Sequence, residues 1–226
     1  VAGDTEEVAQ EHGVESIHWC DIAAVTEAAK SADLMVLGGG GLFQDYWPVH
    51  PENMLSPDHG SISNYTGFAF LAYLTRTPLV IWAVGIGPLR TEDGGRYTRA
   101  AFQIATRASV RDEGSLSLLK ELGVDTTNVA VGADPVFLLA PRGSAAELIA
   151  SAGLDPDIPT VMVSVRDWPG AWQETFALGL DRTLASLPGH QVLFVPFLRS
   201  GLDKPGDAAP SATILGSMKN APQAAI

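Results

Sequence analysis

The sequence predicts an open α/β fold with a doubly wound, parallel sheet. Short apolar runs alternate along the chain with amphipathic stretches of helical length. The runs are unbroken and rich in Val, Ile and Leu, which is typical of strands that are buried on both faces of a parallel sheet. Capping and turn residues separate the two kinds of segment, so strands joined by helices are expected.

The apolar runs are the expected strands. The runs that begin at Leu34, Leu79 and Ala108 are each followed by glycine or charged residues, and we expect them to pair in parallel within one sheet. In chain order, the expected strands are Ser16–Trp19, Leu34–Leu37, Leu79–Val84, Ala108–Arg111, Val129–Val131, Thr160–Val165 and Gln191–Pro196.

Helix starts are marked by side chains that can accept hydrogen bonds from free helical N–H groups, and helix ends by glycine or proline. On this basis the expected helices are Ile22–Lys30 capped by Asp21, a helix through Leu74 capped by Ser63 or Asn64, Thr91–Arg107, a helix that Asp112 or Glu113 opens and Gly123 stops, Ala145–Ala152, and a helix with Pro169 in its first turn that runs to Leu187.

A proline-rich segment divides the chain. Between Asp134 and Pro159 the stretches "DPVFLLAPRG" and "GLDPDIP" interrupt the alternation of strands and helices. We therefore expect residues 1–140 to form one lobe, residues 141–154 to form a linker region, and residues 155–226 to begin a second lobe.

Composition excludes several classes of function. The 26 acidic and 14 basic side chains give a net charge of -12, which argues against nucleic acid or an anionic membrane surface as the main partner. A local basic pocket for one small anion is compatible with that charge. Cys20 is the single cysteine, so an internal disulfide and a cysteine metal cluster are excluded. No apolar stretch approaches the roughly 20 residues of a transmembrane segment.

Glycines and aspartates gather after the expected strands, where ligands bind in an open parallel sheet. The stretch "GGGGLFQD" follows Leu37, "GIGPLR" follows Val84 and "GADP" follows Val131. These glycines either form tight turns or use their backbone N–H groups to hold a phosphate or carboxylate. The aromatic pair Tyr46–Trp47 directly follows "GGGGLFQD". These two side chains either stack on a sugar ring or seal their loop. Candidate binding residues are Gly38, Gly39, Gly40, Gly41, Gly85, Gly87 and Asp134.

Arg111 is the strongest single candidate. An arginine at the end of a buried strand, beside a glycine-rich crevice, needs an anionic partner. That partner is either a carboxylate of the chain, namely Asp112, Asp134 or Asp45, or a bound phosphate or carboxylate that accepts two hydrogen bonds from the guanidinium. The same two interpretations hold for Arg166.

An ordered set of motifs resembles the polysaccharide pyruvyl transferase family. The motifs are "DLMVLGGGGLFQD", "AVGIGP", "ASVRDEGSLSLLKELGV", "VGADPVFLL", "VSVRDW" and "FVPF". The resemblance covers roughly residues 1–200, and it is closest to the bacterial cell-wall branch known as CsaB.

The resemblance implies two Rossmann-like lobes in a GT-B-like arrangement. It implies transfer of an enolpyruvyl unit from phosphoenolpyruvate onto a sugar, which forms a pyruvate ketal and releases phosphate. In the CsaB branch the acceptor is an N-acetylmannosamine-type sugar of a lipid-linked or polymeric cell-wall precursor, and the product anchors surface-layer proteins. The resemblance implies neither a metal nor an organic cofactor. It implies a cytoplasmic location, and it allows peripheral association with the inner face of the membrane and a homo-oligomer.

The resemblance also assigns site residues. Arg111 matches the arginine of the family's "VRD" motif and is expected to bind the donor, and Asp45 is the second catalytic candidate. Gly38–Gly41 and Gly85–Gly87 are expected to line the cleft, with Asp134 and Arg166 as further substrate contacts.

The chain departs from the family pattern in two places. The family pattern places a histidine in an R-x-H motif and a lysine farther along the second lobe, but no R-x-H motif follows Arg166 and the chain stops before the expected position. The family's first strand and helix are also expected to be missing. We therefore expect most of the first lobe and a truncated second lobe, which leaves open whether the chain is active alone. The alternatives are a GT-B glycosyltransferase that uses a nucleotide sugar and a non-catalytic remnant that binds sugar polymer.

Overall fold

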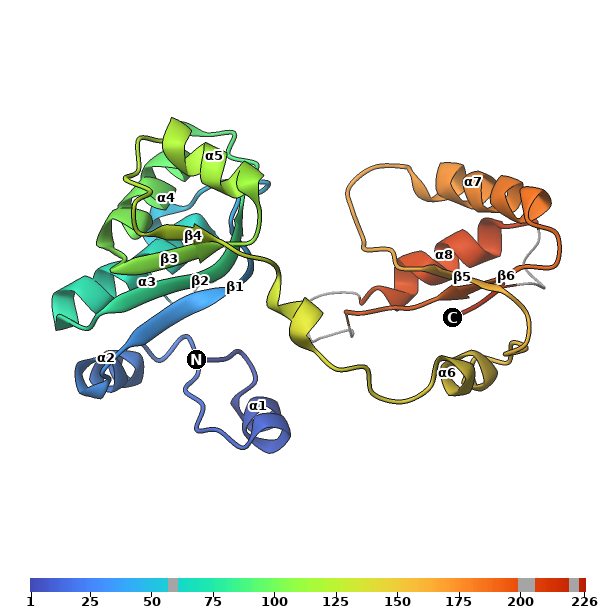
Figure 1. Ribbon diagram of the computed structural model, residues 1–226, viewed down its shortest axis with the longest axis horizontal. Coiled ribbons are helices and arrows are strands. Elements are labelled where there is room, and N and C mark those ends of the chain that lie inside the picture. Colours follow the sequence, from blue (N-terminus) through green and yellow to red (C-terminus); the bar gives the residue numbers. More distant parts are fainter. Residues whose placement is uncertain (57–60, 199–205, 220–223) are drawn as a thin grey trace. The chain divides into compact units, whose positions relative to one another are not determined.

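Parallel strands form the centre of both parts of the computed structural model, which describes residues 1–56, 61–198, 206–219 and 224–226. The chain divides into two compact units, residues 1–139 and residues 140–226. Each unit combines one parallel sheet with helices, as Figure 1 shows. The lobe limits expected from the sequence stay a prediction.

The first unit contains a four-stranded sheet with the order β1-β2-β3-β4. All neighbouring strands pair in parallel, so the predicted parallel pairing is confirmed. The strands are β1 (Met35–Phe43), β2 (Leu79–Ile86), β3 (Arg107–Val110) and β4 (Val129–Val131). The helices of this unit are α1 (Thr5–His12), α2 (Ile22–Ser31), α3 (Ile62–Thr75), α4 (Glu92–Ile104), α5 (Glu113–Glu121) and the short 3₁₀ helices η1 (Pro51–Asn53) and η2 (Pro135–Leu138).

One face of this sheet carries the core. Helices α3, α4 and α5 lie over that face in Figure 1, and their apolar side chains join those of the strands in one buried cluster. On the opposite face, Val36 is 55% exposed and Trp82 is 48% exposed. The expectation of strands buried on both faces is therefore wrong for β1 and β2, because no described helix covers these two side chains.

The glycine run belongs to a strand rather than to a loop. Gly38 pairs with Trp82 and Gly40 pairs with Val84, so β1 continues through the glycines to Phe43. A Cβ atom on Gly38 would collide with the carbonyl oxygen of Trp82, so the close approach of β1 to β2 requires glycine here. The expectation that the strand ends at Leu37 is wrong for this reason.

Several expected boundaries are corrected. Ser61, rather than Ser63 or Asn64, occupies the N-cap position of α3, although its side chain makes no capping hydrogen bond. Helix α7 begins at Gln173, after Pro169. The segment Ser16–Trp19 forms only an isolated bridge between Ala2 and His18. Asp21 and Asp112 do cap α2 and α5, as expected, because each carboxylate accepts a first-turn N–H. Thr91, expected as the first residue of its helix, is instead the cap of α4, and its hydroxyl accepts the N–H of Gly94.

The second unit has a three-stranded parallel sheet with the order β5-β6-β7. Its core contains Val163, Leu184, Phe194 and Ile214. Its elements are α6 (Ala145–Ser151), β5 (Thr160–Val163), α7 (Gln173–Ser186), β6 (Gln191–Phe194), α8 (Ala208–Ser217) and β7 (Ala224–Ala225). Both expected strands, Thr160–Val165 and Gln191–Pro196, end two residues earlier than predicted. Among the described segments, no helix has the length and apolarity to cross a bilayer.

The close approach at Gly38 leads to a stability prediction. Gly38→Ala should lower the free energy of unfolding by at least about 2 kcal/mol, because the new methyl group meets a backbone carbonyl that cannot rotate away. Gly41→Ala is the matched control, since its nearest neighbour would be Arg111 Nη2 at 3.9 Å. Its effect should stay within about 1 kcal/mol. Urea unfolding of both variants measures the difference, and equal losses would contradict the steric argument.

Candidate functional site

Arg111 lies directly after β3 at the carboxyl edge of the first sheet. Its backbone N–H donates to the carbonyl oxygen of Val84 over 3.1 Å, which extends the pairing of β3 with β2 by one residue. Its side chain is 37% exposed. The guanidinium is thus held at the sheet edge and remains accessible to solvent.

Two carboxylates flank the guanidinium. Arg111 Nη1 donates to Asp134 Oδ2 over 3.2 Å, and Arg111 Nε lies 3.9 Å from Asp112 Oδ2. The other carboxylate oxygen of Asp134 accepts the N–H of Val136 over 3.1 Å, so Asp134 also caps η2. Among the described residues, Asp134 is the single hydrogen-bond acceptor of this guanidinium, and its other N–H groups remain available to a ligand.

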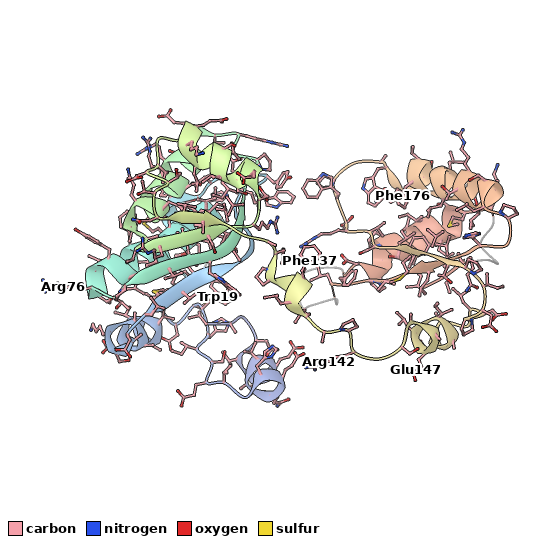
Figure 2. All side chains as sticks on the ribbon, in the orientation of Figure 1. Trp19, Arg76, Phe137, Arg142, Glu147 and Phe176 are labelled. Atoms are coloured by element: carbon pink, nitrogen blue, oxygen red, sulfur yellow. The ribbon has the colours of Figure 1, made fainter. Side chains whose placement is uncertain are left out.

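Asp134 lies beside an apolar surface. Helix η2 exposes Phe137 by 81% and Leu138 by 85%, and Phe137 is labelled on this helix in Figure 2. Asp134 therefore binds Arg111 and also fixes the start of η2. The first unit ends just after η2, at Leu139.

Gly85 provides the surface on which the guanidinium rests. A Cβ atom at Gly85 would lie 2.5 Å from Nε, 2.6 Å from Nη2 and 2.7 Å from Cζ of Arg111. The three distances are nearly equal, so a face of the planar guanidinium is turned toward Gly85. Any larger residue at position 85 would displace Arg111. The structure brings Arg111, Asp134 and Gly85 together, and a Cβ atom at Gly41 would lie 3.9 Å from Arg111 Nη2. Their role in binding stays a prediction.

The other predicted glycines have backbone conformations that favour glycine, and Gly87 also has a close neighbour. Gly87 has a φ of 99° and donates its N–H to the carbonyl oxygen of Phe43 over 2.7 Å. A Cβ atom at Gly87 would lie 2.7 Å from Leu118 Cδ1 of α5. Gly39 and Gly40 have φ angles of 83° and 82° within β1. A role of these glycines in substrate binding stays a prediction.

Asp45 is buried, with 5% of its surface exposed. Its Oδ1 accepts the N–H of Arg90 over 2.6 Å, and its Oδ2 accepts both the N–H and the hydroxyl of Thr91 over 2.7 Å. A Cβ atom at Gly94, in the first turn of α4, would lie 2.5 Å from Oδ2. Position 94 must therefore be glycine to leave room for the carboxylate. These contacts join the end of β1 to the loop after β2. The catalytic role of Asp45 stays a prediction.

The residues after Asp45 form an exposed aromatic surface. Tyr46 is 42% exposed and Trp47 is 55% exposed. The guanidinium carbon of Arg90 lies 5.3 Å from the centre of the Tyr46 ring, which is a cation–π contact. Sequence reasoning missed Arg90. Its position in "GIGPLR", after a strand of the same sheet, was the available signal.

Asp112 is kept ionised by its neighbours. Backbone and side-chain hydrogen bonds from Ser115, and to a smaller extent the positive charge of Arg111, hold the pKa of Asp112 below its ordinary value of 3.8. The N–H of Ser115 donates to Asp112 Oδ1 over 2.7 Å. The ionised form of Asp112 is therefore favoured beside Arg111.

Arg166 belongs to the second unit. It follows β5 and is exposed. Its contribution to the site of Arg111 stays a prediction. In the described part of the chain, no group of three or more His, Cys, Asp or Glu side chains is placed to hold a metal ion.

Comparison with known proteins identifies the family. The family described as polysaccharide pyruvyl transferase matches residues 9–204, which is most of the chain. The chain belongs to this family. No curated protein matches it at a significant level.

A comparison with solved structures shows the fold. A crystal structure described as a UDP-N-acetylglucosamine 2-epimerase from Listeria monocytogenes matches with a TM-score of 0.55 and 11% identity, over 91% of this chain and 49% of that one. The chain therefore spans about half the length of that protein. At this identity the likeness shows the fold alone, and it confirms the predicted class of Rossmann-like α/β units of the GT-B type.

Proposed function

We propose that the protein transfers an enolpyruvyl unit from phosphoenolpyruvate to a sugar of a cell-wall polysaccharide precursor, as in the CsaB branch of the family. Family membership supports pyruvyl transfer onto a polysaccharide. The observation that supports an anionic donor is the guanidinium of Arg111, which lies at the carboxyl edge of the sheet with a single hydrogen-bond acceptor among the described residues.

The reaction sets out what the site has to supply. A sugar hydroxyl adds to the central carbon of the enol while a proton is delivered to its CH₂ carbon. A second hydroxyl then displaces phosphate from the same carbon and closes the ketal. The donor carries a phosphate and a carboxylate, so it needs fixed N–H donors where its charge lies. The acceptor needs a base for its hydroxyl groups. Arg111 fits the first requirement because its planar donors match either anion.

The acceptor is proposed to be an N-acetylmannosamine-type sugar, and its contacts are proposed to be Tyr46 and Trp47. Both aromatic side chains are exposed at the carboxyl edge that also carries Arg111. Buried Asp45 holds the backbone beside them, and Arg90 holds the Tyr46 ring. An aromatic surface fixed in this way offers its rings to the apolar face of a pyranose, and Arg90 can donate to sugar oxygens.

A second candidate function is transfer from a nucleotide sugar. It is favoured by the fold similarity to a protein described as a UDP-N-acetylglucosamine 2-epimerase. A third candidate is a sugar-binding remnant without catalysis. The pyruvyl transferase is expected to bind phosphoenolpyruvate, the glycosyltransferase a nucleotide sugar, and the remnant neither of these anions.

Thermal stability separates these candidates. Phosphoenolpyruvate at millimolar concentration should raise the Tm of the full-length protein, because a ligand that binds only the folded state stabilises it by mass action. UDP-N-acetylglucosamine and UDP should raise it much less. Differential scanning fluorimetry measures both, with inorganic phosphate as a control for charge alone. A larger shift with the UDP-sugar would favour the glycosyltransferase, and no shift with either anion would favour the remnant.

Arg111 should contribute to donor binding rather than to stability alone. Arg111→Lys and Arg111→Ala should lower kcat/KM for phosphoenolpyruvate by about tenfold to a hundredfold, which corresponds to one charge-assisted hydrogen bond of roughly 1.5–3 kcal/mol. The KM for the acceptor should change little. Phosphate release at varied donor concentration provides the measurement.

Arg107→Ala is the matched control for Arg111, because Arg107 begins the same strand at the opposite edge and bonds Asn128. Its donor kinetics should stay normal. If Arg111 only pairs with Asp134, its variants would lower Tm and leave the folded enzyme with normal donor kinetics, which would remove Arg111 from the site.

The aromatic surface should affect the other substrate. Tyr46→Ala and Trp47→Ala should raise the KM for a methyl glycoside of N-acetylmannosamine about threefold to tenfold, with an unchanged KM for phosphoenolpyruvate. Tyr73→Ala is the control, because Tyr73 is 68% exposed and lies near the far end of α3, three residues before the Arg76 that is labelled in Figure 2. An unchanged acceptor KM in both aromatic variants would show that the pair only seals its loop.

A further inference from the structure

Strand β2 is irregular where it passes Arg111. Between Ile81 and Val84 it advances three residues, while the paired segment of β3 from Ala108 to Val110 advances two. The extra residue makes a bulge, and Ala83 within it has a φ of 51°, a conformation that L side chains rarely adopt. A bulge of this kind turns a backbone N–H away from the regular ladder, and that N–H then needs another acceptor.

Two serine hydroxyls accept N–H groups on either side of Gly85. The N–H of Ala83 donates to Ser109 Oγ over 2.9 Å, and the N–H of Ile86 donates to Ser115 Oγ over 2.9 Å. Ser109 lies in β3, two positions before Arg111, and Ser115 lies in the first turn of α5, four positions after it. The segment from Ala83 to Ile86 is thereby tied to both flanks of Arg111.

That segment carries the surface on which Arg111 rests. Gly85 lies between the two bonded N–H groups, and a Cβ atom there would come within 2.7 Å of the guanidinium. The guanidinium thus occupies the space where a Cβ atom of Gly85 would lie, so a shift of the Gly85 backbone changes the space that is open to it. The carbonyl oxygen of Val84, just before it, accepts the N–H of Arg111 over 3.1 Å. The position of the cation thus depends on the position of this short piece of β2.

We propose that Ser109 and Ser115 are positioning residues that fix Gly85, and through it the guanidinium of Arg111, for binding of the donor anion. The inference rests on the proposed function, in which Arg111 binds the donor. Ser115 is 1% exposed and also holds Asp112 beside Arg111 by its hydrogen bonds. A hydroxyl is required because it accepts the strand N–H, which a methyl group cannot do. Without it, the N–H of buried Ala83 or Ile86 loses its acceptor and the segment must rearrange.

Kinetics of the full-length protein test the proposal. Ser109→Ala and Ser115→Ala should each lower kcat/KM for phosphoenolpyruvate roughly threefold to tenfold, with an unchanged acceptor KM. Ser109→Thr keeps the hydroxyl in a strand that suits a β-branched residue, so it should restore most of the donor kinetics. Ser63→Ala is the matched control. Ser63 lies at the start of α3, is fully buried, and donates its hydroxyl to the carbonyl oxygen of His50. It should lose stability and keep normal donor kinetics.

A second measurement separates this inference from the proposed function. The side-chain Nε–H signal of Arg111 in a ¹⁵N-correlated NMR spectrum, assigned by its loss in Arg111→Lys, should shift in both serine-to-alanine variants and stay in place in Ser63→Ala. If Arg111→Ala leaves phosphoenolpyruvate kinetics unchanged while the signal still shifts, the proposed donor site fails and the positioning role stands. An unmoved Nε–H signal in Ser109→Ala and Ser115→Ala would overturn the positioning role.

Discussion

The position of Arg111 depends on one steric condition, which is the absence of a side chain at Gly85. The guanidinium lies against the α-carbon of this residue, in space that a Cβ atom would fill. A similar condition holds where Gly38 of β1 approaches the carbonyl of Trp82 on β2. Gly38 and Gly85 therefore allow close approach inside a sheet, of backbone to backbone and of a cation to backbone. They differ in this respect from a phosphate-binding loop, in which glycines expose successive N–H groups to solvent.

The parts of the fold that depend on local sequence could be predicted. Strand cores and the caps Asp21 and Asp112 follow from short apolar runs and from side chains that bond the next turn. The start of α3 could not be predicted in this way. Asn64 donates to the carbonyl of Asn53, and Ser63 to that of His50, so both are held by a segment more than ten positions away, while Ser61 occupies the N-cap position.

The candidate site shows the same division. The rule that ligands bind at the carboxyl ends of parallel strands brought Arg111, Asp134 and Gly85 into one prediction, and the structure places them together. The burial of Asp45 could not be anticipated, because its partners Arg90 and Thr91 follow a different strand. The roles of Ser109 and Ser115 could not be predicted either. In "SVRDEGS" they resemble ordinary strand and helix-start residues, and their role follows from a bulge in β2 that no sequence pattern indicates.

The charge of the chain determines which kind of donor binding is consistent with this site. The net charge is -12, and Asp134 and Asp112 both lie beside Arg111. Long-range attraction therefore does not favour the approach of an anion, and the field of the Arg111 guanidinium is partly cancelled before a ligand arrives. Favourable binding must come from contacts at hydrogen-bond distance, whose strength depends steeply on geometry. In such a site the orientation of the cation matters more than the amount of charge. The steric condition at Gly85 and the two serine hydroxyls that hold its segment then become part of the binding chemistry.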